Sequence, residues 1–103
     1  MTSFEISTTK YEEDIKLIQV AMTKMEAICN VASGFKFGEP TSRFGWTLLQ
    51  IYLDQELCMG IEDKFSDMIK KCKGHKPDEK FTNFLNQHLE SEGCNVKIKM
   101  ASG

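Results

Sequence analysis

The stretch that decides the fold is residues 44–59, Phe-Gly-Trp-Thr-Leu-Leu-Gln-Ile-Tyr-Leu-Asp-Gln-Glu-Leu-Cys-Met. On a helical wheel, its apolar side chains cover most of the circumference, and only Thr47, Gln50 and Asp54 form a polar wedge. A helix of this kind is either the centre of a compact domain or one half of an interface. The sequence therefore predicts a helix over about 43–59 that is hidden by the rest of the chain or by a second molecule.

Three further segments have a helical pattern of apolar residues: 10–33, 61–73 and 77–92. Glycines follow the four segments, where a left-handed cap would end each helix, at Gly34, Gly60, Gly74 and Gly93. Thr9 and Glu12 have the spacing of a capping box at the start of the first helix. Together these patterns predict a mainly α fold, a compact four-helix domain spanning residues 1–103.

Short alternating segments stand near both ends of the chain. Phe4-Glu5-Ile6 alternates apolar and polar residues, and so does the segment 95–100. This is the pattern of a half-exposed strand. The two segments could pair into a small ribbon that joins the termini, but an isolated pair of strands is marginal without packing support. The pairing is left open by the sequence.

Composition narrows the classes of function. The net charge is −2, so no global basic field attracts nucleic acid. No apolar run approaches the roughly 20 residues that span a bilayer, and the N-terminus lacks a secretory pattern. We therefore expect a cytoplasmic protein with no membrane role, in which the widely spaced cysteines Cys29, Cys58, Cys72 and Cys94 are free thiols.

Aromatic residues mixed with cations are the first candidate binding site. Phe35-Lys36-Phe37 is followed by Arg43-Phe44-Gly45-Trp46. Such a mixture can stack nucleic-acid bases or anchor a protein partner. We expect these aromatic and cationic residues to form a partner-binding surface: Phe35, Phe37, Arg43, Trp46 and Tyr52. The simpler alternative is that Phe35 and Phe37 fold back and close one end of the core.

A basic cluster between residues 70 and 80 is the second candidate. Backbone N–H groups at a helix start can bind a phosphate, and lysines nearby would add charge. The residues of this alternative site are Lys71, Lys73, His75 and Lys76. Lysines are also common at helix C-termini and in solvated loops, where they bind nothing.

A metal-like spacing is the third candidate. Cys72 and His75 form one close pair, His88 and Cys94 form another, and twelve residues separate the two histidines. Paired thiolate and imidazole ligands with a gap of this order are typical of tetrahedral zinc. However, His88 and Cys72 both fall on apolar helix faces, which favours structural roles for them.

No catalytic constellation is visible. The chain has neither a Gly-x-Ser-x-Gly elbow nor a His-Glu-x-x-His pair. We expect a protein that is not an enzyme and needs no cofactor. The leading hypothesis is a protein-interaction module, such as an adaptor, a regulator or a small inhibitor of the kind that phages and mobile elements encode, which also self-associates into a homo-oligomer. The alternatives are a ligand, phosphate or nucleic-acid binder at residues 70–80, and a zinc-stapled module.

Overall fold

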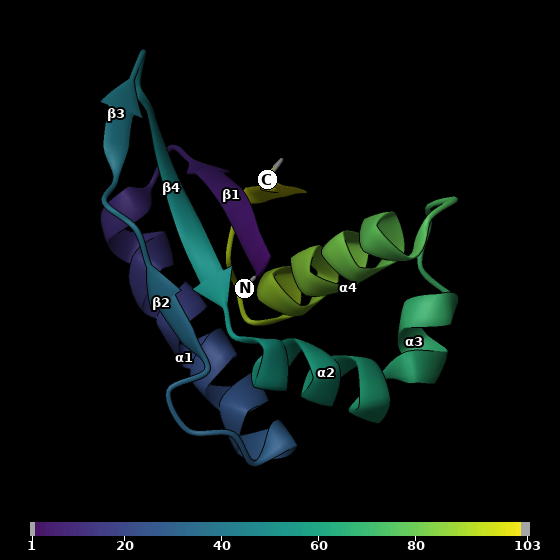
Figure 1. Cartoon of the computed structure of the whole chain (residues 1–103). Coiled ribbons are helices and arrows are strands. Elements are labelled where there is room, and N and C mark those ends of the chain that lie inside the picture. The colour runs from purple at the N-terminus through teal and green to yellow at the C-terminus, as the bar shows by residue number, and fades with distance from the viewer. Residues whose placement is uncertain (1, 102–103) are drawn as a thin grey trace.

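A computed structural model describes residues 2–101 as a layer of helices against an antiparallel sheet (Figure 1). Helices account for 49% of the residues and strands for 25%. The prediction of a mainly α four-helix bundle is therefore wrong, and the fold is α+β. The elements follow in the order β1 (Thr2–Thr8), α1 (Tyr11–Cys29), β2 (Phe35–Phe37), β3 (Thr41–Arg43), β4 (Trp46–Leu53), α2 (Gln55–Lys64), α3 (Ser66–Lys70), α4 (Pro77–Ser91) and β5 (Lys97–Met100).

The decisive error lies in the predicted helix over 43–59, whose first part is strand β4. Its side chains alternate, so that Leu49, Ile51 and Leu53 are buried and the residues between them are only half-buried. A positive-φ turn at Phe44 and Gly45 precedes the strand, and Asp54 directly after it is the N-cap residue of α2. Eight residues is an ordinary strand length. The sequence of a strand with apolar residues on both faces resembles that of a helix that is apolar on all sides, because periodicity alone cannot separate the two.

The helical segments are partly as expected. An amphipathic helix does form at α1, but it ends at a left-handed Asn30 (φ 57°) and not at Gly34. The expected capping box is absent from its start, where Lys10 is the capping position and makes no side-chain cap. Gly60 lies inside α2 and not at a helix end, and a Cβ there would come within 2.9 Å of the Cys29 Cβ. This glycine therefore permits α1 and α2 to pack closely.

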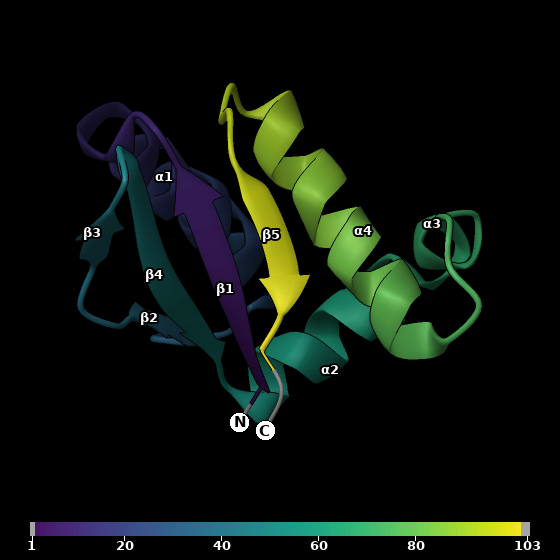
Figure 2. The ribbon, with the colours of Figure 1, turned by 90° about the horizontal axis from the view of Figure 1, so that it is seen from above.

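The sheet has the strand order β2-β4-β1-β5, with β3 also paired to β4, and every pairing is antiparallel (Figure 2). The terminal strands do pair, with Phe4 opposite Met100 and Ile6 opposite Ile98. Strands β1 and β2 run in the same direction, are joined through α1 and have β4 between them. This is the split β-α-β arrangement, and its central strands are β1 and β4.

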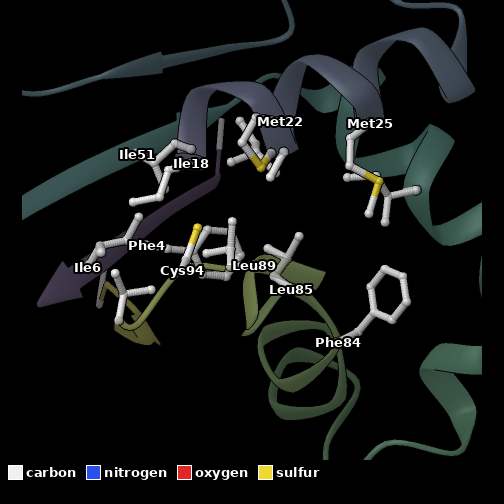
Figure 3. Packing of buried hydrophobic residues seen from close by; sticks show 14 of the residues in the cluster. Phe4, Ile6, Ile18, Met22, Met25, Ile51, Phe84, Leu85, Leu89 and Cys94 are labelled. Carbon is white, nitrogen blue, oxygen red and sulfur yellow. The ribbon is translucent and has the colours of Figure 1, made fainter. Parts of the chain in front are cut away.

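One face of the sheet carries the core. Phe4 and Ile6 of β1 and Ile51 of β4 point toward α1 and α4, and they meet side chains from both helices (Figure 3). The labelled helix residues in that view are Ile18, Met22 and Met25 of α1 and Phe84, Leu85 and Leu89 of α4. Since consecutive residues of a strand point to opposite faces, the other face of β1 and β4 receives none of this packing.

A buried carboxylate joins three parts of the chain. Asp14, in the first turn of α1, is only 3% exposed. Its Oδ2 accepts a hydrogen bond from the Thr8 hydroxyl at 2.5 Å, and its Oδ1 accepts one from the Asn95 backbone N–H at 3.3 Å. The Asp14 side chain therefore connects the end of β1, the start of α1 and the segment that leads into β5.

The strand assignment of β4 predicts unequal effects for two neighbouring apolar residues. Ile51→Ala opens a cavity in the core and should lower the free energy of unfolding by about 2–5 kcal/mol. Leu48→Ala removes a half-buried side chain from the opposite face and should cost less than about 1 kcal/mol. Urea denaturation of both variants measures the difference. Equal losses would contradict the strand, because Leu48 and Ile51 share one side of the helix that the sequence predicted.

The Asp14 contacts predict a second loss of stability. Asp14→Ala leaves the Thr8 hydroxyl and the Asn95 N–H without their acceptor and should lower the free energy of unfolding by about 1–3 kcal/mol. The exposed neighbour Glu13 gives a matched control, since Glu13→Ala removes a similar charge from the positive end of the helix dipole. A loss for Asp14→Ala no larger than that for Glu13→Ala in thermal or urea unfolding would show that the buried contacts contribute nothing.

Candidate functional site: the open face of the sheet

The sheet face turned away from α1 and α4, here called the open face, is the candidate site. The alternation of side chains along each strand and the pairing register show which residues belong to this face. All of them are half-buried or exposed. They are Ser3, Glu5 and Ser7 of β1, Trp46, Leu48, Gln50 and Tyr52 of β4, Lys97 and Lys99 of β5, and Lys36, Thr41 and Arg43 of the interrupted edge strand.

Cations and aromatic rings lie together on the open face. The Lys97 Nζ is 5.7 Å from the centre of the Trp46 ring, within the range of a cation–π contact. Lys99 Nζ is 3.3 Å from the Glu5 carboxylate. No carboxylate of residues 2–101 lies within salt-bridge distance of Lys36, Arg43 or Lys97. The open face therefore has a positive surplus in a chain whose net charge is −2.

The turn between β3 and β4 holds an aromatic ring in water. Phe44 is 94% exposed, and the hairpin that carries it projects beyond the rest of the molecule (Figure 1). Both turn residues have positive φ, 52° at Phe44 and 79° at Gly45, as the tight turns of two-residue hairpins require. Positive φ is common for glycine and unfavourable for a bulky residue. The chain thus keeps an exposed phenylalanine at a strained position, where a small polar residue would be better suited.

A hollow of about 390 Å³ lies beside the edge strand. Three residues, 38–40, stand opposite two on β4 between the pairs Phe37–Ile51 and Thr41–Leu48, which makes a β-bulge. Gly38 lies against the Tyr52 ring, and a Cβ there would come within 3.3 Å of the ring. The polar side chains around the hollow are Glu5, Glu39, Thr41, Arg43, Gln50 and Tyr52.

The structure separates the predicted partner-binding residues into two groups. Arg43, Trp46 and Tyr52 share the open face, as described above. Phe35 and Phe37 lie on the opposite face of the sheet, packed against the core with their ring centres 5.6 Å apart. The partner-binding role stays a prediction, and it now concerns Arg43, Trp46 and Tyr52 alone.

Sequence reasoning missed several members of the open face. The predicted helix puts Gln50 in its polar wedge, and the predicted terminal ribbon gives Lys97 and Lys99 no neighbours on β4. The alternation in 97–100 is the signal that could find Lys97 and Lys99, because alternate residues of a strand share a face. Segment 46–53 has apolar residues on both faces and gives no such signal for Gln50.

The phosphate-site candidate has a different environment. The His75 backbone N–H, just before α4, donates a hydrogen bond to Glu79 Oε2 at 2.9 Å. Lys80 Nζ contacts the Lys70 carbonyl at 3.4 Å. The Glu79 carboxylate thus already accepts the hydrogen bond that the His75 N–H would have to donate to a bound phosphate. The assignment of Lys71, Lys73, His75 and Lys76 to phosphate binding stays a prediction without support from this geometry.

The four residues of the zinc hypothesis are not brought together. Within residues 2–101, no group of three or more His, Cys, Asp or Glu side chains is arranged to hold a metal ion. The Cys72 thiol donates to the Met68 carbonyl at 3.3 Å, and His88 Nε2 is 3.0 Å from the Ala21 carbonyl oxygen. Cys94 is buried, whereas His75 is exposed. Each of the four therefore has its own local environment.

Comparison with protein-family models, with curated proteins and with solved structures gives no match to this chain. Over residues 2–101, no helix combines the length and the apolar character needed to cross a membrane. The function must therefore be argued from the residues of the open face.

The buried thiol of Cys94 allows a test of the packing behind the site. Burial, together with the carboxylates of Asp14 and Glu92, raises the pKa of Cys94 to about 11 from the ordinary value of 9.0. Since the thiolate is the reactive form, the native thiolate population at about pH 8 should be roughly a hundredfold lower than in the unfolded chain. Alkylation followed by mass spectrometry measures this, and Cys94 reacting as fast in the native as in the denatured protein would contradict the structure.

Proposed function

We propose that this chain is a non-catalytic binding module that holds single-stranded nucleic acid on the open face of its sheet. The observation that carries the proposal is the combination of Trp46 and Tyr52 on one surface with cations that have no salt bridge to any residue of 2–101. The hypothesis of a protein partner rested mainly on the apolar surplus in residues 44–59. Only part of that surplus is used in the core, where Leu49, Ile51 and Leu53 are buried, whereas Met59 is 60% exposed. On the open face, segment 44–53 leaves two aromatic residues, Trp46 and Tyr52, accessible together with Leu48 and the polar Gln50.

The two kinds of side chain suit the two parts of a nucleotide. Aromatic rings stack on bases with little regard to sequence, at about 1–3 kcal/mol per base. Lysine and arginine neutralise the phosphates. Trp46 and Tyr52 are six residues apart on one strand, which is roughly 20 Å at the rise of a β-strand. Lys36 of β2 and Arg43 of β3 lie beside β4, and Lys97 of β5 lies beyond β1. A strand of nucleic acid along β4 would therefore have cations on either side.

The architecture is compatible with this use. An open four-stranded sheet backed by helices is how one class of module stacks two or three bases of single-stranded RNA. Likeness of architecture does not establish function, so the proposal depends on the named side chains. A duplex presents its bases edge-on in grooves and offers no ring faces for stacking, so we expect preference for single strands.

A protein partner is the second candidate, and one observation favours it. Phe44 is exposed at the tip of the projecting hairpin, and buried aromatic anchors dominate many protein interfaces. In either case we place the module in the cytoplasm, a proposal supported by four cysteines that are all unpaired.

The proposal predicts measurable binding of short single strands. Fluorescence anisotropy with labelled RNA and DNA strands of about ten nucleotides, within the site sizes of single modules, should show saturable binding, and duplexes of equal length should bind less. Contacts from three or four cations should give a slope of about −2 to −3 in log K against log salt. Trp46→Ala should weaken binding by about 5- to 150-fold through lost stacking, and Trp46→Phe should restore part of it.

Matched charge variants separate the two candidate nucleic-acid surfaces. Lys97→Glu changes the open face, whereas Lys71→Glu changes the basic cluster between residues 70 and 80. Loss of affinity in Lys97→Glu alone supports the open face. Loss of affinity in Lys71→Glu alone would place the nucleic-acid site at residues 70–80. Absence of binding by every strand rejects nucleic acid, and light scattering that shows mass rising with concentration would then favour self-association.

A further inference from the structure

We infer that the hollow beside the β-bulge is a base-specificity pocket that accepts one guanine of the bound strand. This inference rests on the proposed function, because it assigns a base to one part of the same open face. Stacking on Trp46 and pairing of cations with phosphates do not distinguish bases. The hollow is the part of the open face where charged donors and acceptors of both kinds surround a recess.

The size of the hollow suits one base. Its volume of about 390 Å³ lies near the lower end of the range for small-ligand sites. The Tyr52 ring forms one side, and Gly38 has no side chain that would displace that ring. A base that enters the recess can therefore lie against Tyr52 while its edges meet the polar groups around it.

The polar groups match guanine better than the other bases. Guanine presents two adjacent acceptors, O6 and N7, which arginine recognises by two parallel hydrogen bonds. Its Watson–Crick edge presents two adjacent N–H donors, at N1 and N2, which suit a carboxylate that only accepts. Arg43 and Glu5 both line the hollow and supply these two complements. Uracil lacks the paired N–H edge and offers the Glu5 carboxylate a single N–H donor between two carbonyl oxygens.

The structure also fixes the position of the reading carboxylate. Glu5 lies on the central strand β1, directly opposite Gln50 on one side and Lys99 on the other. Lys99 contacts the Glu5 Oε1 at 3.3 Å, and no protein hydrogen bond of the described residues uses Glu5 Oε2. Gln50, beside Glu5, carries an amide that can both donate and accept. Lys99 therefore holds the Glu5 carboxylate from the side of β5. The side of this carboxylate that faces β4 is left for a ligand.

The test compares strands that differ in one base. The probes are uridine oligomers of about ten nucleotides with a single central G, A or C, together with the all-uridine strand. The guanine strand should bind about 5- to 150-fold more tightly than all-uridine, as one good bidentate contact provides. Glu5→Gln introduces donors where guanine needs acceptors, and Arg43→Lys keeps the charge but loses the bidentate fork. Both should reduce the ratio of guanine to uridine affinity toward one.

The exposed residue Glu13 on α1 provides the matched control, since Glu13→Gln should leave that ratio at the wild-type value. A wild-type protein that binds all four strands equally overturns the guanine pocket and leaves the proposed function standing. A guanine preference that survives both Glu5→Gln and Arg43→Lys also overturns the assignment to this hollow. If none of the strands binds, the proposed function fails and the pocket fails with it.

Discussion

The pairing of β1 with β4 is the constraint on which the rest of the structure depends. Seven consecutive pairs, from Thr2–Leu53 to Thr8–Thr47, fix the register. A slip of one residue would move every side chain of one strand to the opposite face. The buried set of Phe4, Ile6 and Ile51 specifies the register, because exposing large side chains of this kind costs about 1.5–3 kcal/mol each. The same parity places Glu5, Gln50 and Tyr52 on the open face, so the core and the candidate site are two results of one register.

The helices cover only one side of that sheet, and the connections keep them there. Asp14 connects the end of β1 and the start of α1 to the segment before β5, and Gly60 lets α2 approach α1. The edge strand, in contrast, is interrupted by the bulge at 38–40, beside the hollow. Bulges are common beside functional sites because they redirect side chains. The regular helices and paired strands therefore surround the core. The irregular segments, which are the bulge and the Phe44 turn, border the open face.

Some elements of this fold could be predicted from the sequence, and the others could not be predicted for physical reasons. The stripe of apolar residues in 10–33 predicted α1, because a helix with one buried face has a clear period. The alternation at both ends indicated strands, yet their stability depended on β4, without which a pair is marginal. Strand β4 was misread because its open face also carries apolar side chains, Trp46, Leu48 and Tyr52, so both periods fitted. Arg43, Trp46 and Tyr52 could be proposed from the local sequence, because aromatic residues and cations stand close together there. Glu5, Lys97 and Lys99 join them only through pairing between distant segments, which no local pattern contains.

The most direct test of the account is an NMR titration of the ¹⁵N-labelled protein with a short single-stranded RNA. The account predicts that backbone amide shifts change along β4, in the bulge and the Phe44 turn, and near Lys97 and Lys99, while the amides of α1 and of residues 70–80 change little. Changes confined to residues 70–80, or spread over the helices with β4 unaffected, would contradict the claim that the open face of the sheet is the binding surface.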